Sequence, residues 1–173
     1  FDEALALNER VVALDPLSPT YLTNLAGQYA WRGMRERAAG AHERAMEVDP
    51  GWHVSYARAA YFSYFIGDYD LAALRGAHGA TVEGPDARLA ASAAWITANA
   101  WLALGDYDAA REWLSYALEA GKPRLWIDQV EIRIRLAEGR DGDAHELLDR
   151  WVARIPPEGG CCLHHHTEPA GKI

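Results

Sequence analysis

The densest cluster of metal-ligating residue types lies near the end of the sequence, where a Cys-Cys-Leu-His-His-His run begins. Thiolate and imidazole groups can bind zinc or nickel, and the candidate ligands are Cys161, Cys162, His164 and His166. These ligands are neighbours, without the intervening residues that let a short chain wrap around a tetrahedral ion. We therefore predict a loosely held tail over residues 158–173, and metal binding there is the less favoured alternative.

Two other patterns come close to metal sites and miss a required ligand. His145 opens a His-Glu-Leu-Leu-Asp run in which Asp149 stands where a zinc protease helix needs its second histidine. The aspartates near positions 68 and 106 have calcium-loop spacing but lack the later glutamate ligand. The sequence also contains no nucleophile elbow, phosphate-binding glycine loop or dinucleotide fingerprint. We predict that the chain is not an enzyme and uses no cofactor.

The charge balance limits the classes of partner. The formal net charge is −8, and Lys122 and Lys172 are the only lysines. An acidic chain repels nucleic acid and anionic membrane surfaces, and no apolar run is long enough for a membrane helix. We therefore expect neither nucleic acid nor membrane binding. The sequence leaves the compartment open and favours the cytoplasm. Because it begins at Phe1, we interpret the chain as a fragment or a processed product.

An internal repeat is the main signal in this sequence. A Gly-x-x-x-x-Ala pattern recurs with glycine-to-glycine intervals of 34, 38 and 34 residues, at Gly33/Ala38, Gly67/Ala72, Gly105/Ala110 and Gly139/Ala144. An Asp-Pro pair recurs with the same 34-residue interval, at Asp15-Pro16 and Asp49-Pro50. Repeats of this length indicate a solenoid of stacked units.

Each element of the repeat has a physical reason. Glycine ends a helix because it adopts the left-handed cap conformation without strain. The aspartates that follow, Asp68 and Asp106, can cap the next helix. The recurring alanines, of which we expect Ala38, Ala72 and Ala110 to be buried, let two antiparallel helices approach closely. Proline then stops the second helix. The unit is a helix, a tight turn, a helix and a sharp stop.

The repeat resembles the tetratricopeptide repeat family. The matching positions in residues 20–50 are Leu25, Ala26, Tyr29, Gly33, Ala38, Ala45 and Pro50. The resemblance implies an all-α fold, a right-handed superhelical solenoid of antiparallel helix pairs with about four and a half repeats. We expect a repeat domain over residues 1–157, followed by the tail. Its units are a half repeat over 1–16 and full repeats over 17–50, 51–84, 85–123 and 124–157.

Three departures from the pattern lead to further expectations. The 38-residue interval inserts four residues near 84–88, which either extend the following helix by a turn or lengthen the loop. Glu131 occupies a position that is usually apolar, and a one-residue shift of its helix would explain this. The helix over residues 1–14 lacks its partner helix, so we expect its apolar edge to contact an upstream helix or another chain, with a homo-oligomer as one possibility.

In the resembled family, the first helix of each repeat lines a concave binding face. The positions carried over are aromatic with amides and arginines, a mixture that protein interfaces enrich; packing between repeats is the alternative role for individual rings. They are Asn24, Trp31, Arg58, Tyr61, Tyr64, Phe65, Trp95, Asn99, Leu102, Trp126 and Arg133, with Thr20, Thr23 and Gly27 on the same face. Arg111, on a second helix, is expected to face outward. A carboxylate clamp built from lysines is excluded, because no lysine precedes Lys122.

We therefore predict a scaffold that binds a protein or peptide in this aromatic groove. The alternative is a regulatory or ligand-sensing segment of a larger bacterial signalling or transcription-regulator protein.

Overall fold

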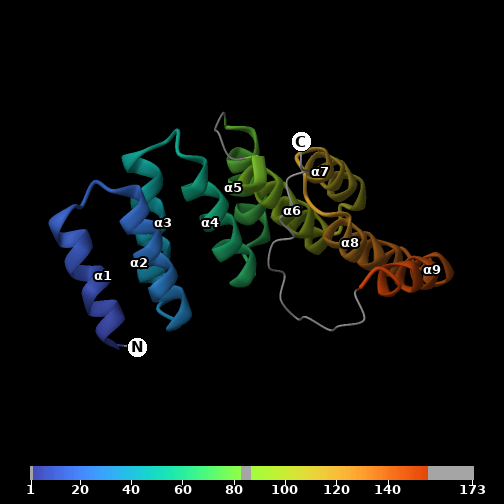
Figure 1. Cartoon of the computed structure of the whole chain (residues 1–173), viewed down its shortest axis with the longest axis horizontal. Coiled ribbons are helices and arrows are strands. Elements are labelled where there is room, and N and C mark those ends of the chain that lie inside the picture. The colour runs from blue at the N-terminus through green and yellow to red at the C-terminus, as the bar shows by residue number, and fades with distance from the viewer. Residues whose placement is uncertain (1, 83–86, 156–173) are drawn as a thin grey trace, which may run out of the picture.

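A computed structural model describes residues 2–82 and 87–155, and this part of the chain contains nine helices and no strand. The helices succeed one another in chain order along an extended row from α1 to α9 (Figure 1). They are α1 (Asp2–Leu14), α2 (Pro19–Trp31), α3 (Arg35–Val48), α4 (His53–Phe65), α5 (Tyr69–Thr81), α6 (Ala87–Leu104), α7 (Tyr107–Glu119), α8 (Arg124–Ala137) and α9 (Asp141–Val152). The predicted all-α solenoid of helix pairs is confirmed.

Glycine turns separate the two helices of each pair. Their φ angles lie in the left-handed region, at +72° for Gly33, +86° for Gly67, +85° for Gly105 and +72° for Gly139. A side chain would be strained in this conformation, and the turn reverses the chain within a few residues. The helix that follows is capped as expected in two pairs, because Oδ1 of Asp68 accepts from the amide of Leu71 and Oδ1 of Asp106 from that of Ala109.

Small residues lie where the helices pack. Ala38, Ala72 and Ala110 have no exposed surface, which confirms their expected burial. Gly76 of α5 faces α6 so closely that a Cβ would lie 2.3 Å from Oγ1 of Thr97. The helices of this solenoid therefore approach at contacts that leave no room for a larger side chain.

The contacts between pairs define an inner and an outer side. The first helices contact one another in sequence, α2 with α4, α4 with α6 and α6 with α8. Within the described residues, the backbones of α3 and α5, and those of α5 and α7, do not approach each other as closely. Long side chains join them: Arg75 of α5 pairs with Glu43 of α3, and the Tyr116 hydroxyl of α7 donates to the carbonyl oxygen of Ala80 of α5. The first helices must therefore lie on the inside of the curve. We call the face formed by α2, α4, α6 and α8 the concave face.

The 38-residue interval between Gly67 and Gly105 is explained by a longer helix α6, one of the two alternatives left open by the sequence. Helices α2 and α4 have 13 residues each, whereas α6 has 18 and begins at Ala87. The additional residues continue the helix at its N-terminal end by about one turn. Because whole turns preserve the facing of a helix, α6 keeps its place in the array.

Helix α8 keeps the 34-residue register of α6, so the one-residue shift considered from the sequence is wrong. The buried Ile127, Val130 and Ile134 stand 34 residues after the buried Ala93, Ile96 and Ala100. The charged residues Asp128, Glu131 and Arg135 of α8 take part in ion pairs. The ion pair with Arg135 is what lets Glu131 occupy a position that is usually apolar.

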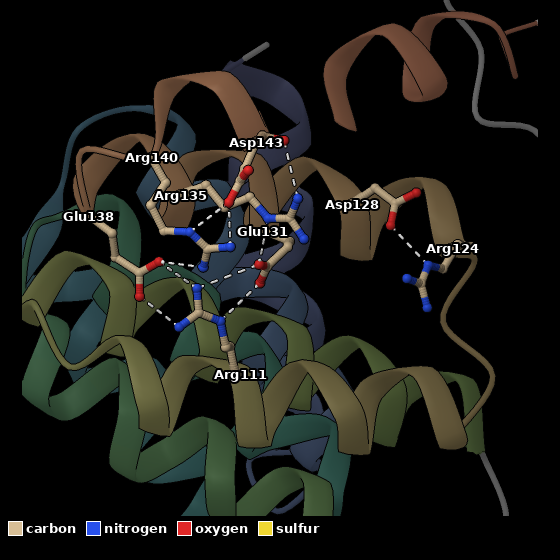
Figure 2. A network of polar contacts seen from close by, with 8 residues as sticks. All are labelled: Arg111, Arg124, Asp128, Glu131, Arg135, Glu138, Arg140 and Asp143. Carbon is tan, nitrogen blue, oxygen red and sulfur yellow. Dashed lines mark hydrogen bonds and ion pairs between the residues drawn. The ribbon is translucent and has the colours of Figure 1, made fainter. Parts of the chain in front are cut away.

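An ion-pair network joins α7 to the last helix pair (Figure 2). The Arg111 guanidinium lies 2.7 Å from Glu138 and 3.3 Å from Glu131, and Arg135 pairs with Glu131 at 2.9 Å. Arg111 was expected to face outward, but its side chain is only 31% exposed and is held by Glu131 of α8 and by Glu138, which directly follows α8. Arg140 pairs with both Glu138 and Asp143.

A buried aspartate holds the two ends of the last pair together. Only 2% of the Asp128 side chain is exposed, and its carboxylate accepts from Arg124 at 2.9 Å and also from Arg154. A buried carboxylate needs such partners, because removing it from water without them is costly.

Helix α1, at the start of the array, packs against its neighbours through one side only. Leu5 and Val12 contact the core cluster of α2 and α3, and Glu9 accepts from the hydroxyl of Tyr29 at 2.9 Å. The side chains of Leu7 and Leu14 are 52% and 87% exposed. This exposed edge is the surface for which the sequence predicts a contact with an upstream helix or another chain, and that stays a prediction.

The contact of α5 with α6 leads to a stability prediction. Gly76→Ala should lower the free energy of unfolding by about 1–3 kcal/mol, because the methyl group would press on the buried Thr97 hydroxyl. Gly40→Ala, at an exposed position of α3 with open space around its Cβ, should instead raise it by about 0.5–1 kcal/mol. Urea unfolding of both variants measures the difference. If Gly76→Ala were as stable as Gly40→Ala, the described packing of α5 on α6 would be wrong.

The network around Arg111 predicts a pH dependence. The hydrogen bond from Arg111 holds the pKa of Glu138 at about 2, below its ordinary value of 4.5. The ionised carboxylate therefore stabilises the fold above pH 4.5, and this contribution is lost as the pH falls towards 2. Glu138→Gln should lower the melting temperature by a few degrees at pH 7 and by nothing near pH 2.

The control for this variant is Glu146→Gln, an exposed glutamate of α9 outside the network. It should leave the melting temperature unchanged at both pH values. An equal loss of stability at pH 7 and pH 2 for Glu138→Gln would contradict the role given to its charge.

Candidate functional site

A pocket opens between α2 and α4 on the concave face. Its volume is about 480 Å³, which lies within the range of ligand pockets in proteins. We call it the α2–α4 pocket, and most of its lining is apolar. The lining residues are Thr23, Gly27, Ala30 and Trp31 of α2, His42 of α3, and Arg58, Tyr61, Phe62 and Phe65 of α4.

Two aromatic rings at the ends of these helices are open to solvent. Trp31 ends α2 and is 89% exposed, and Phe65 ends α4 and is 78% exposed. They occupy equivalent positions 34 residues apart, so the repeat brings them to the same end of the pocket. Exposed apolar groups that gather beside a concavity indicate an interaction site.

Gly27 keeps the pocket open. It lies in the interior of α2, where glycine costs about 1 kcal/mol relative to alanine. A Cβ built at this position would have no atom within 4 Å, so the space in front of it belongs to the pocket. The equivalent residue of α4 is Tyr61, which forms part of the opposite wall.

The polar end of the pocket is formed by Arg58 and Asn24, also equivalent positions of α4 and α2. The guanidinium of Arg58 donates to Oδ1 of Asn24 at 3.3 Å, and both side chains are exposed. The amide fixes one end of the guanidinium, which has five N–H donors in total. Arg58 lines the pocket and is exposed, so its other N–H groups are open to solvent or to a bound partner.

His42 contributes a buried imidazole to the pocket lining. Only 3% of it is exposed, its ring lies 5.4 Å from that of Phe62, and its Nδ1 has no hydrogen-bond partner. Burial lowers the pKa of His42 to about 4, and the positive charges of Arg75 and Arg58 act in the same direction. The imidazole is therefore neutral at pH 7.

The other half of the concave face is occupied by the chain's own side chains. Nε1 of Trp95 donates to the carbonyl oxygen of Trp126 at 3.2 Å, and the two rings meet edge to face at 5.4 Å. The Lys122 ammonium lies 5.1 and 5.3 Å from the two ring centroids and donates to Oγ of Ser92. Burial lowers the pKa of this lysine. Both half-buried indoles are engaged within the fold.

Two residues expected on the groove surface are buried instead. Asn99 is 2% exposed, donates to the carbonyl oxygen of Trp95 at 2.9 Å and accepts from Arg133 at 2.7 Å. Leu102 is 9% exposed and belongs to the core cluster of α6, α7 and α8. The expectation that these two side chains present themselves to a partner is therefore corrected.

Tyr64 is half-buried between Phe65 and Tyr69, with ring centroids 5.9 and 5.5 Å away. It packs where α4 turns into α5, outside the lining of the α2–α4 pocket. Of the eleven predicted groove residues, the pocket lining contains Trp31, Arg58, Tyr61 and Phe65, with Asn24 beside Arg58.

Comparison with known proteins gives a partial sequence match. No protein-family model matches the sequence. A heat-shock protein cognate co-chaperone of Aspergillus fumigatus, sgt12, is 30% identical over 69 residues. The match covers 40% of this chain and 20% of that protein, so the chain spans about a fifth of the length of this relative.

Similar solved structures agree over most of the chain. MamA matches with a TM-score of 0.73 and 16% identity over 88% of this chain and 87% of that one. YrrB, described as a TPR protein with an unusual peptide-binding site, matches with a TM-score of 0.67 and 15% identity over 86% and 75%. This chain has the tetratricopeptide repeat fold. The N-terminal domain of stress-induced protein-1 of C. elegans has the same arrangement at 18% identity and a TM-score of 0.61, over 66% and 93%.

Sequence reasoning on this tetratricopeptide array did not identify His42 as part of the site. The available signal is its place on α3, one residue after Ala41 and three before Ala45, which puts it on the buried stripe of that helix. The side chain of a residue on this stripe points towards the neighbouring helices. For His42 these are α2 and α4, so its ring forms part of the pocket lining.

The candidate metal ligands of the tail, Cys161, Cys162, His164 and His166, lie outside the described residues. Within residues 2–82 and 87–155, no group of three or more potential ligands is placed to hold a metal ion. Over the same residues, no helix combines the length and apolar character needed to cross a membrane.

Proposed function

We propose that this chain is a binding scaffold that accepts a segment of another protein, or a peptide, in the α2–α4 pocket. The observation that carries the proposal is an apolar pocket of about 480 Å³ whose mouth is flanked by the exposed rings of Trp31 and Phe65. Binding would remove both rings from water, and their apolar area would contribute most of the affinity.

The shape of the pocket favours a single large anchor. Trp31 and Phe65 flank one end, Phe62 lies deeper in the wall, and Gly27 leaves the space between them free. Central anchors that fill such pockets usually dominate binding, while the surrounding contacts exclude water. A leucine, phenylalanine or tryptophan of the partner would fit the pocket by volume and character.

The remaining concave surface supports the same choice of pocket. Trp95 and Trp126 already contact each other and Lys122, so a partner there would have to displace contacts within the chain. The rings of Trp31 and Phe65 are exposed, so a partner could contact them without displacing other side chains. We therefore place the principal contact in the N-terminal half of the array, with Tyr61 at its boundary, 6.4 Å from the Trp95 ring.

The chemistry of the lining favours binding over catalysis. Its polar members are Thr23, His42, Arg58 and the Tyr61 hydroxyl, and it contains no carboxylate that could act as a general base. The peptide-binding description of YrrB, a protein of the same fold, is consistent with a scaffold role. We propose no catalytic role for this site.

Filling the pocket from within tests the proposal. Gly27→Leu should place an isobutyl group in the open space and weaken partner binding at least about tenfold. The fold should be retained or slightly stabilised, because leucine is a better helix former than glycine. The probes are peptides selected from a random displayed library by binding to the parent chain, and the measurement is their dissociation constant.

Gly40→Leu is the matched control, since it makes the same exchange at an exposed position of α3 away from the pocket. It should leave the dissociation constants within about twofold of the parent. Selected peptides that bind Gly27→Leu as tightly as the parent, or a library without binders, would count against the proposal.

A further inference from the structure

The ammonium group of Lys122 occupies a corner between two indole rings in the C-terminal half of the concave face. It lies over both rings, 5.1 Å from the centroid of Trp95 on α6 and 5.3 Å from that of Trp126 on α8. These distances are within the range of a cation–π interaction. The chain itself therefore supplies a cation to an aromatic site, which we call the Trp95–Trp126 corner.

The Trp95–Trp126 corner is held together without the lysine. The indole N–H of Trp95 donates to the carbonyl oxygen of Trp126 at 3.2 Å, and the two ring planes meet at 77°. Tyr61 of α4 extends the aromatic surface, with its ring 6.4 Å from that of Trp95. All three rings are half-buried, so each keeps part of its surface open. Because these contacts do not involve Lys122, we expect the corner to persist when the ammonium group leaves.

A primary ammonium group is a poor match for the chemistry of this corner. It has three N–H donors, and the acceptor that the structure gives Lys122 is Oγ of Ser92, at 3.1 Å. None of the ion pairs among the described residues includes this lysine. Burial lowers the pKa of Lys122, so the site disfavours its charged form relative to water. Aromatic faces with few acceptors suit a cation that has no N–H groups.

We propose that the Trp95–Trp126 corner is a binding site for a quaternary ammonium group, which enters as the Lys122 side chain leaves. A quaternary ammonium group spreads its charge over methyl groups, needs no hydrogen-bond acceptor and is bound by aromatic faces. It can come from a trimethylated lysine of a partner protein or from a free choline-like molecule. The site lies beyond Tyr61 from the α2–α4 pocket, and the inference does not depend on the proposed function.

Lys122 can leave the corner without a rearrangement of the fold. Its backbone is fixed in the turn after α7, where its N–H donates to the carbonyl oxygen of Ala117 at 2.8 Å and Gly121 has a φ of +92°. The ammonium group ends a flexible four-carbon chain, so side-chain rotation alone can move it into solvent. There it regains its hydration, which offsets the lost ring contacts. The formal charge of −8 also favours uptake of a cation by the chain.

Titration with tetramethylammonium chloride at constant ionic strength tests the inference. The indole N–H signals of Trp95 and Trp126 in NMR spectra report binding and give the dissociation constant. Choline is titrated in the same way, with dimethylbutanol as its neutral control, because that molecule has carbon in place of the charged nitrogen. The variants are Lys122→Ala, Trp126→Leu and the control Arg44→Ala, which removes a positive charge from an exposed position of α3.

Tetramethylammonium should shift both signals in the parent and bind Lys122→Ala at least about fivefold more tightly, because the competing ammonium group is gone. Trp126→Leu, followed through the Trp95 signal, should bind at least about fivefold more weakly than the parent, because one of the two indole faces is missing. Arg44→Ala should bind like the parent. Choline should bind more tightly than dimethylbutanol, because the positive charge supplies the attraction to the rings.

Two amino-acid derivatives with blocked ends, trimethyllysine and unmethylated lysine, distinguish the sources of the group. Tighter binding of trimethyllysine than of choline would identify a methylated lysine of a partner, and the reverse order a free choline-like molecule. Either order supports the site. Unmethylated lysine that binds as tightly as trimethyllysine would overturn the inference, because the corner would then not select a quaternary ammonium group.

Unchanged Trp95 and Trp126 signals in the parent would also overturn the inference, as would equal affinities of choline and dimethylbutanol. The same holds if Lys122→Ala and Arg44→Ala gain affinity equally, because the effect would then come from the net charge and not from exchange with Lys122. The α2–α4 pocket is tested separately by Gly27→Leu, so neither result decides the other.

Discussion

The close contact between helices at small residues is the constraint on which the rest of this structure depends. At Ala38, Ala72 and Ala110 the side chains are fully buried, and at Gly76 even a methyl group would collide with Thr97. Such close packing fixes the relative placement of the helices within and between pairs. With the second helices outside, the first helices of successive pairs are brought into contact and form a continuous concave face.

The site follows from this repeat geometry and from one local exception to it. Stacking two equivalent helices places Trp31 beside Phe65 and Asn24 beside Arg58, so the pocket has an aromatic and a polar end. Stacking alone would close the space between them with side chains. Gly27 opposite Tyr61 leaves it open. In the next pairs the corresponding space is occupied by Trp95, Trp126 and Lys122.

The fold could be predicted from the sequence because its determinants are local. The glycine turns, the capping aspartates and the recurring alanines act within a few residues of their own positions, and each is found where it was expected. The same register placed Trp31, Arg58 and Phe65 on a common face. These residues lie near each other because of the repeat itself, so knowing the repeat was sufficient.

The errors concern side chains whose surroundings come from distant segments. Arg111 was expected to face solvent, but Glu131 and Glu138 of the following pair neutralise it. Asn99 has the polarity of a surface residue and is buried because Trp95 and Arg133 satisfy its amide. A 34-residue register predicts which way a residue points, but it contains no information on whether another pair covers it.

The tryptophans offer a direct measurement of the central claim, that a partner binds in the α2–α4 pocket. The chain has seven, spread along the array, and each indole N–H gives its own NMR signal that substitution to phenylalanine can assign. Titration with a selected peptide should shift the Trp31 signal strongly. The signals of Trp95, whose N–H is bonded to Trp126, of Trp113 on a second helix, and of Trp151, bonded to Leu125, should change little. A peptide that shifts Trp95 or Trp113 and leaves Trp31 unchanged would contradict the account.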